Sequence, residues 1–225
     1  MDANIVHDCC APTHNRTLEL KDHGCGSVSA AGGTPDLVVV GAGSAGFSAA
    51  IRAGELGAKV VLIGHGTIGG TCVNIGCVPS KTLIRAAEAL HHARSASRFA
   101  GITGTAELTD WHALVAQKDS LVSAMRTAKY EELLPRYDHI RYVAGAARFT
   151  KGGLQVADEV FSSERVVIAT GAAPAMPAIS GLAAVPWLTS TTALSLEKLP
   201  KSLLVIGGGV IGCELGQMFA RFGVQ

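Results

Sequence analysis

Residues 36–46 read Asp-Leu-Val-Val-Val-Gly-Ala-Gly-Ser-Ala-Gly, and this stretch decides the fold. The run Leu37–Val40 is uniformly apolar, which is typical of a parallel strand buried on both faces. Residues 47–56 have a helical composition and are followed by Gly57, a residue type that often ends helices. Residues 59–63 form a second apolar run. A strand, glycine turn, helix and strand within about 28 residues predict a βαβ dinucleotide-binding unit.

The glycines of that turn predict phosphate binding. Gly41 allows the tight turn, Gly43 lets the backbone approach a pyrophosphate, and Gly46 lets the helix pack against the strand. Ser44 and Ala45 lie at the start of the helix, where free amides and the helix dipole attract phosphate. A tight turn with a purely structural use is the alternative.

One position departs from the usual pattern of such a unit. The second strand normally ends in an acidic residue that binds the ribose hydroxyls. Here Gly64 and His65 follow the strand, so the carboxylate is absent. We expect either a weaker affinity for adenosine, or replacement of the acid by His65 and backbone groups.

Composition excludes several classes of protein. The chain has 225 residues, enough for one domain and part of another, and its hydrophobic fraction of 48% excludes overall disorder. Nineteen basic residues, 18 acidic residues and 5% aromatic residues give no basis for binding nucleic acid or an anionic membrane. No signal-peptide pattern begins the chain, and prolines and glycines interrupt the uncharged stretch 166–196. We therefore expect a soluble, cytoplasmic protein.

The first 34 residues are predicted to be a tail and linker, because they show no amphipathic period. They contain the neighbouring thiols Cys9 and Cys10, which suit a two-coordinate thiophilic metal ion. A leader whose cysteines bind nothing is the alternative.

Further elements are expected along the rest of the chain. One helix should run from the Cys72 region to about Arg98, and another, capped by Asp110, from Trp111 to about Leu134. Gly152-Gly153 predicts a hairpin turn among a series of short strands at 140–143, 146–150, 154–156, 160–162 and 165–169.

A second glycine motif follows an apolar run near the end of the chain. Residues 203–206 should be a strand, Gly207, Gly209 and Gly212 a phosphate-binding turn, and residues 213–222 a helix. The next strand would lie beyond Gln225, so the chain looks truncated. We expect a domain at 35–198 and the beginning of a second nucleotide-binding domain at 199–225.

Two cysteines lie in residues 69–81, Gly-Gly-Thr-Cys-Val-Asn-Ile-Gly-Cys-Val-Pro-Ser-Lys. Cys72 and Cys77 are five positions apart and can close a small disulfide if the turn between them is tight. A nearby helix N-terminus would favour a thiolate, as in a redox couple that passes two electrons to a flavin or a substrate. Spacing alone leaves a structural disulfide equally open.

The same segment strongly resembles the redox-active segment of the pyridine nucleotide–disulfide oxidoreductases. From about residue 36 onward the chain is similar to that family, and its mercuric reductases are matched best, by residues 66–88, 128–131, 147–149 and 187–191. The resemblance implies an α/β fold of the FAD/NAD(P)-binding, Rossmann-like, three-layer type. A β-meander and the start of a second nucleotide-binding domain would complete it.

The resemblance also implies roles for individual residues. Cys77 would lie against the flavin ring as the charge-transfer thiolate, Cys72 would be the outer interchange thiol, and Lys81 would lie near flavin N5. The FAD contacts would extend beyond the first glycine turn to Gly69, Gly70, Thr71, Ala169, Thr170 and Gly171.

By resemblance, a hydride would pass from NADPH to FAD and two electrons onward to the Cys72–Cys77 disulfide. The final acceptor would be Hg(II), a soft cation suited to these two thiolates, which would leave as Hg(0). Full-length relatives are expected to be homodimers. A relative of dihydrolipoyl dehydrogenase and a non-catalytic FAD-binding fragment are the alternatives, and the sequence does not choose between NADH and NADPH.

Overall fold

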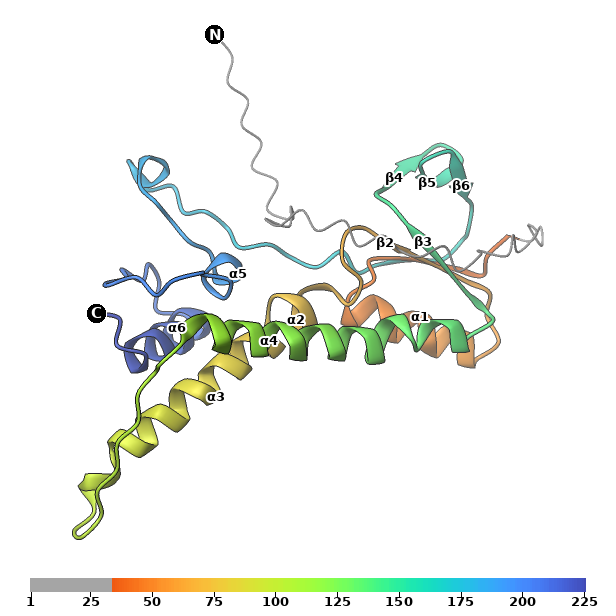
Figure 1. Ribbon diagram of the computed structural model, residues 1–225. Helices are drawn as coiled ribbons and strands as arrows, with labels where there is room; N and C mark the ends of the chain where they lie inside the picture. The colour runs from red at the N-terminus through yellow and green to blue at the C-terminus, as the bar shows by residue number, and fades with distance from the viewer. Residues whose placement is uncertain (1–33) are drawn as a thin grey trace.

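A computed structural model describes residues 34–225, and its centre is a four-stranded parallel sheet (Figure 1). The strands are β1 (Leu37–Val40), β2 (Val60–Gly64), β3 (Ile140–Ala144) and β7 (Val166–Ile168), in the order β3-β2-β1-β7. All three pairings are parallel, so the carboxyl ends of the strands share one edge. Ligands of open α/β sheets bind at that edge.

The sheet is the middle of three layers. On one face lie α1 (Ser44–Glu55) and the π-helical turn η2 (Thr127–Glu131), which bury Val39 and Leu62 together with Phe47. On the other face an antiparallel meander covers Val38 and Ile63. Its strands are β4 (Ala147–Thr150), β5 (Gly153–Val156) and β6 (Glu159–Phe161). The expected three-layer fold with a β-meander is confirmed.

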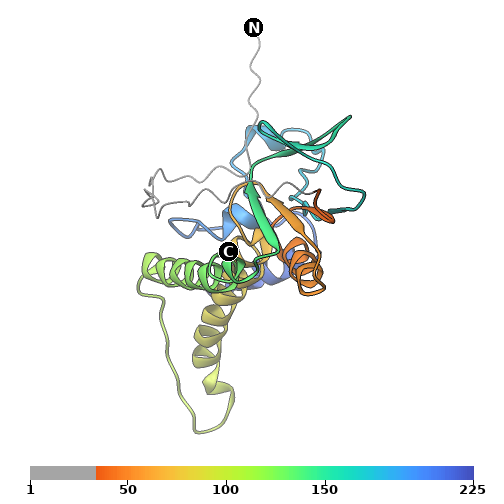
Figure 2. The same cartoon turned by 90° about the vertical axis from the view of Figure 1, so that its right-hand side faces the viewer.

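A helical arm extends from the sheet (Figures 1 and 2). The long helices α3 (Cys77–Arg94) and α4 (Trp111–Arg126) form it with α6 (Val210–Arg221). Two smaller pieces, η1 (Ala96–Arg98) and α5 (Ser190–Ala193), join the arm. A separate core fills the arm with the side chains of Leu83, Leu90, Trp111, Leu194, Met218 and Phe219.

Two polar side chains of α4 hold residues 194–196, which follow α5, against the arm. Trp111 Nε1 donates to the Leu196 carbonyl at 2.8 Å, and Lys118 Nζ donates to the Leu194 carbonyl at 2.9 Å. Lys118 is only 2% exposed and also pairs with the Asp119 carboxylate. Its buried charge is therefore compensated.

The prediction of a single helix from the Cys72 region to about Arg98 is wrong. The structure has a five-residue helix α2 (Gly70–Asn74), a turn at Ile75–Gly76, and then α3 and η1. A Cβ on Gly76 would lie 2.9 Å from the Thr71 carbonyl oxygen, so the backbone closes a sharp turn that a side chain would obstruct. That turn separates the two cysteines into different helices.

The helix predicted from Trp111 begins where expected, because Asp110 Oδ1 accepts from the Ala113 amide at 3.1 Å. Its end was predicted wrongly. The α-helical part stops at Arg126, and η2 and a 3₁₀ turn at Leu134–Arg136 (η3) follow.

The meander strands occur within two residues of their predicted bounds, and β4 and β5 turn at Gly152, with Thr150 opposite Gly153. The strand predicted at 203–206 is not formed. Within residues 34–225, no strand pairs with this segment. Its first residue is held by a hydrogen bond from the Leu203 amide to the Gln225 carbonyl at 2.7 Å. Leu204 is accordingly 87% exposed. The helix predicted at 213–222 starts earlier, at Val210.

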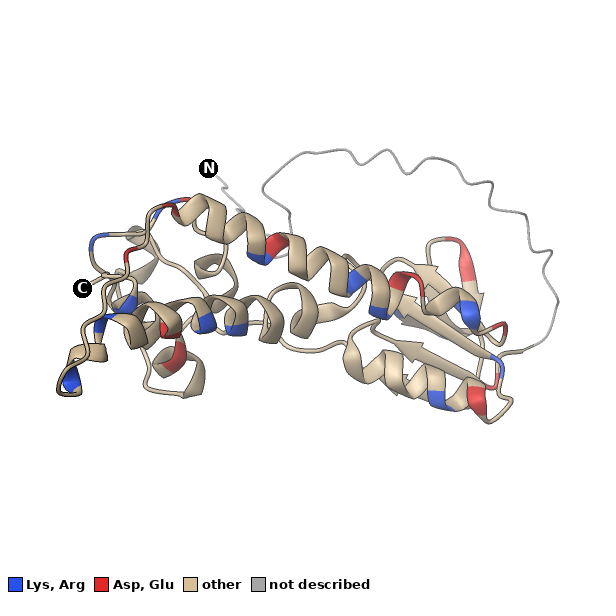
Figure 3. Cartoon of the chain, turned by 60° about the horizontal axis from the view of Figure 1, so that its bottom comes forward, with Lys and Arg blue, Asp and Glu red and all other residues tan. Residues whose placement is uncertain are grey.

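Basic and acidic residues are interspersed along the helices and loops (Figure 3). A short 3₁₀ turn, η4 (Leu182–Ala184), interrupts the long connection between β7 and α5.

Among the residues described, none of the helices has the length and apolar character needed to cross a bilayer. The predicted tail, with Cys9 and Cys10, lies outside these residues apart from Thr34.

Candidate active site

The first glycine turn connects β1 to α1 at the carboxyl edge of the sheet. Gly41 has φ +115°, and a Cβ there would overlap the Ala169 carbonyl. A Cβ on Gly46 would overlap the Gly41 carbonyl in the same way. Two of the three motif glycines are therefore required by close backbone packing.

The segment leading to the cysteines lies directly beside this turn. The Gly69 amide donates to the Ala42 carbonyl at 2.9 Å, and Gly43 and Gly69 form a parallel bridge. A Cβ on Gly70 would lie 2.6 Å from the Cα of Gly43. These approaches form a backbone cradle, which we define as Gly41–Gly46 with Gly69–Thr71.

The predicted third contact, after β7, borders the same cradle. The Ala169 amide donates to the Val40 carbonyl at 2.7 Å, which places Thr170 and Gly171 just beyond the glycine turn. The structure thus brings together eleven of the predicted cofactor residues: Gly41, Gly43, Ser44, Ala45, Gly46, Gly69, Gly70, Thr71, Ala169, Thr170 and Gly171.

The cradle fits a pyrophosphate. No side chain caps the N-terminus of α1, and its first turn contains no acidic residue. The first amides of the helix and its positive dipole end are therefore available to an anion. Gly43 offers no side chain that would block the approach of a phosphate.

Sequence reasoning missed the importance of Tyr130. This buried residue of η2 places its hydroxyl 3.2 Å from Ser44 Oγ and its ring edge-on to Phe47, with ring centroids 4.8 Å apart. A Cβ on Gly69 would lie 3.2 Å from the Tyr130 ring. Tyr130 therefore supports both sides of the cradle, and no spacing signal reveals a π-helical turn.

The two cysteines lie next to one another, each at a helix. Cys72 lies in α2, and Cys77 is the first residue of α3, as expected for a thiol at a helix N-terminus. Both are free thiols, with Cys77 exposed and Cys72 half-buried. The hydrogen bond to the Cys77 side chain raises the pKa of the Cys72 thiol, and burial adds to this effect. The positive charge of Lys129 acts in the opposite direction.

Asn74 ties the loop between the cysteines to its surroundings, a role the sequence did not reveal. Its Nδ2 donates to the Ile68 and Gly70 carbonyls, both at 2.9 Å. Its Oδ1 accepts from Arg126 Nη1 of α4 at 3.0 Å. The carboxamide therefore fixes α2, which at five residues is too short to be stable alone.

Lys81 follows Cys77 by one turn of α3 and pairs with the Glu214 carboxylate of α6. Glu214 lies just after the second glycine turn, so this ion pair joins the redox segment to that turn. A position of Lys81 beside flavin N5 stays a prediction.

The second glycine turn repeats the backbone of the first. Gly207 has φ +104°, a Cβ on Gly212 would overlap its carbonyl, and the Cys213 amide donates to Gly209 at 3.0 Å. The equivalent bond in the first turn joins the Phe47 amide to Gly43 at 2.9 Å. Gly207 and Gly209 nevertheless come just before α6, and Gly212 lies in its first turn. The helix α6 belongs to the helical arm and lies apart from α1, which follows the first glycine turn (Figure 1).

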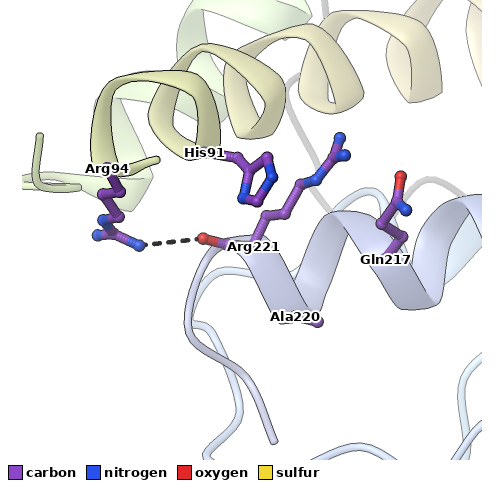
Figure 4. A pocket seen from close by; sticks show the side chains of 5 residues that line it. All are labelled: His91, Arg94, Gln217, Ala220 and Arg221. Carbon is purple, nitrogen blue, oxygen red and sulfur yellow. Dashed lines mark hydrogen bonds between the residues drawn. The ribbon is translucent and has the colours of Figure 1, made fainter. Parts of the chain in front are cut away.

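A basic pocket lies between α3 and α6, lined by His91, Arg94, Gln217, Ala220 and Arg221 (Figure 4). Arg94 donates from Nε to the Ala106 carbonyl at 2.9 Å and from Nη1 to the Arg221 carbonyl at 3.2 Å. These cations lie in the last turns of two helices, where positive charge offsets the helix dipoles. We therefore assign the pocket a structural role.

Comparison with known proteins places this arrangement in a family. Residues 35–225 match the family described as pyridine nucleotide-disulphide oxidoreductase. The chain belongs to this family. The match confirms the family that the resemblance in the sequence predicted.

Curated relatives are considerably longer than this chain. A mercuric reductase of Lysinibacillus sphaericus is 49% identical over 191 residues, which cover 84% of this chain and 35% of the relative. A mercuric reductase of Streptomyces lividans is 47% identical over 194 residues, which cover 84% of this chain and 41% of the relative. The chain therefore spans well under half the length of these relatives.

Solved structures of the same fold include the HOCl-induced flavoprotein disulfide reductase RclA from Escherichia coli. It is 32% identical, with a TM-score of 0.70, and the match covers 84% of this chain and 40% of RclA. A Cu(II) complex of that enzyme matches with a TM-score of 0.72 at 31% identity, and the match covers 86% of this chain and 42% of RclA. No cluster of three or more metal-ligating side chains occurs within residues 34–225.

Proposed function

We propose that this chain is the FAD-binding, disulfide-bearing part of an oxidoreductase that reduces Hg(II) to Hg(0) with NADPH. The adjacent thiols Cys72 and Cys77, beside a pyrophosphate cradle, carry the proposal. Relatives named mercuric reductase, at 47–49% identity, support mercury as the substrate.

Each part of the site has a role in this proposal. The cradle residues bind the FAD pyrophosphate, and the Tyr130 hydroxyl holds Ser44 at the start of α1, beside that pyrophosphate. FAD, when bound, supplies two-electron transfer between the nicotinamide nucleotide and the disulfide. Gly207, Gly209 and Gly212 bind the pyrophosphate of NADPH at the start of α6.

The thiols handle both electrons and metal. Cys77, at the start of α3, takes the inner position toward the flavin, and Cys72 takes the outer one. Their two thiolates hold Hg(II), for which soft sulfur ligands are preferred. Two electrons from NADPH, passed through the bound flavin, would reduce Hg(II) to Hg(0), and both sulfurs would be left as metal-free thiolates. Lys81 holds its position through Glu214.

The test uses the oxidised, FAD-loaded chain under anaerobic conditions, reduced with two equivalents of dithionite so that both the disulfide and the flavin are reduced. The Cys72→Ser/Cys77→Ser variant has no disulfide and therefore receives one equivalent. Hg(II) is added as a low-molecular-weight thiolate complex, and Hg(0) is measured by atomic absorption. We expect about one Hg(0) per reduced flavin, and little in a Cys72→Ser/Cys77→Ser variant. Release of Hg(0) at equal rates from both proteins would overturn the proposal.

A second candidate is a flavoprotein disulfide reductase with a different substrate, favoured by the likeness to RclA. In that case, oxidised glutathione or lipoamide would reoxidise the reduced chain while Hg(II) yielded no Hg(0). A chain that binds FAD but passes electrons to neither acceptor would be a flavin-binding module.

A further inference from the structure

The end of β2 lacks the acid that normally binds ribose, and the structure shows what occupies the space. Gly64 is buried, and a Cβ built there would lie 2.5 Å from the hydroxyl oxygen of Tyr142. It would also lie 2.8 Å from the Cβ of Ala42, which belongs to the cradle. The Tyr142 hydroxyl therefore stands where an acidic side chain at position 64 would begin.

The register of the sheet explains how Tyr142 reaches this place. Tyr142 of β3 pairs with Leu62 of β2, and Gly64 pairs with Ala144. Tyr142 and Gly64 are thus diagonal neighbours on one face, a separation that a long aromatic side chain can span. That face carries α1, and the carboxyl edge is the edge of the cradle.

The Tyr142 hydroxyl has no hydrogen-bond partner within residues 34–225. Burial raises the pKa of its phenol, so the group keeps its proton and can donate. The ring packs against the core on the α1 side of the sheet, which fixes its direction. An oriented, unpartnered donor at this edge is suited to a sugar hydroxyl.

We propose that Tyr142 replaces the missing acid, and that its hydroxyl binds the adenosine ribose of the dinucleotide in the cradle. The inference rests on the proposed FAD binding and deepens it. It also explains why position 64 is a glycine, because the Cβ of any other residue there would collide with the Tyr142 phenol. His65, the substitute that the sequence suggested, is exposed and has no hydrogen bond among the described residues.

The test measures the dissociation constants of two flavins by fluorescence titration. One is FAD, and the other is a flavin dinucleotide made with 2′,3′-dideoxyadenosine, which lacks both ribose hydroxyls. We expect Tyr142→Phe to weaken FAD binding by about 3- to 10-fold, as for the loss of one hydrogen bond. The same variant should bind the dideoxy flavin as the wild type does.

Two matched controls accompany this variant. Tyr137→Phe makes the same chemical change before β3, at the opposite edge of the sheet, and His65→Ala removes the competing candidate. Both should bind FAD within about twofold of the wild type. Circular dichroism and thermal melting verify that each variant is folded.

A second pair of variants tests the exchange of Tyr142 for an acid. Gly64→Glu alone should weaken FAD binding, because the new side chain meets the phenol. Combination with Tyr142→Val removes the contact with the phenol and supplies a carboxylate, although the contact with the Cβ of Ala42 remains. The double variant should therefore bind FAD more tightly than Gly64→Glu alone.

Two results would overturn the inference. Tyr142→Phe could bind FAD as tightly as the wild type, in which case a loss in His65→Ala would assign the role to the histidine, or it could lose the same factor for both flavins. A wild-type chain that binds neither flavin would instead refute the proposed function, and this inference with it.

Discussion

At the scale of single residues, the contact between two thiols governs the chemistry of the site. In the reduced protein, the Cys72 pKa is raised chiefly by the hydrogen bond to Cys77. A raised thiol pKa favours the neutral form in the folded state. The hydrogen bond between the thiols therefore contributes fully to the stability of the folded state below the ordinary thiol pKa. This contribution to stability is lost as the pH rises through the raised pKa of Cys72.

The variant Cys77→Ala should therefore make Cys72 more reactive. Without the hydrogen bond and charge of Cys77, the Cys72 pKa falls toward its ordinary value, and more thiolate is present at pH 8. Alkylation by iodoacetamide should accelerate by about twofold or more, because the thiolate is the reacting form.

Tryptic peptides provide the readout. Residues 60–81 form one peptide that contains no cysteine other than Cys72 and Cys77, and exposed Cys213 lies on the peptide 202–221 as an internal reference. An unchanged ratio of Cys72 to Cys213 alkylation in the variant would show that Cys77 does not control the outer thiol.

At the scale of elements, the five-residue helix α2 depends on its neighbours. Asn74 joins it to Ile68 and Gly70, and Arg126 joins Asn74 to α4. Arg126 is in turn positioned by Glu131 at 3.3 Å. We expect this network to set how closely the two thiols are held together.

Arg126→Gln should lower the tendency of the pair to form a disulfide. Equilibration with oxidised glutathione converts the two thiols into one disulfide and yields two molecules of reduced glutathione. The equilibrium constant, measured from alkylation of the peptide 60–81, should fall by about 3- to 10-fold as one charged hydrogen bond is lost.

Two variants serve as comparisons for this equilibrium. Arg126→Lys can keep one donor to Asn74 and should recover part of the effect, whereas Arg98→Gln removes an exposed arginine that stacks on Phe99. Equal constants for Arg126→Gln and Arg98→Gln would remove Arg126 from any positioning role.

Elements with a strong local signal were predictable from the sequence. The glycine turn after Leu37–Val40, the Asp110 cap and the hairpin at Gly152 each depend on a few neighbouring residues, and all occur. The break at Gly76 was missed because the apolar pattern continues through it. The π-helical turn that positions Tyr130 depends on tertiary packing against the cradle, which local composition does not encode.

The same distinction applies to the candidate site. The motif indicated the cysteines and the cradle, since the backbone geometry there follows from glycine. Asn74, Tyr130, Glu214 and Tyr142 act through partners between 4 and 133 positions away in the sequence, or through space left by a glycine. Only the fold reveals such pairings.

At the scale of the whole molecule, three hydrophobic cores hold the described residues together, one on each face of the sheet and one in the helical arm. Phe219 of α6 is 2% exposed and packs with Leu83 and Met218 in the arm. The second glycine turn keeps its place through this core and through the Lys81–Glu214 pair. Residues 204–206, which were predicted to be part of a strand, contribute little because their side chains are exposed.

Phe219→Ala should lower the free energy of unfolding by about 3–5 kcal/mol, the usual cost of deleting a buried aromatic side chain. Ile211→Ala, at a position on the same helix that is 60% exposed, should change it by less than about 0.5 kcal/mol. Urea denaturation measures both, and similar losses for the two variants would contradict the assigned packing of α6.

The central claim is that Cys72 and Cys77 exchange an electron pair with a flavin bound in the cradle. Anaerobic titration of the oxidised, FAD-loaded chain with dithionite tests it, with flavin absorbance and alkylation of the peptide 60–81 followed together. We expect the first two electrons to open the disulfide, so that the peptide takes up two alkyl groups and a long-wavelength thiolate–flavin band appears before the flavin bleaches. Bleaching of the flavin while the peptide remains unalkylated, or a chain that stays colourless after incubation with FAD, would contradict the account.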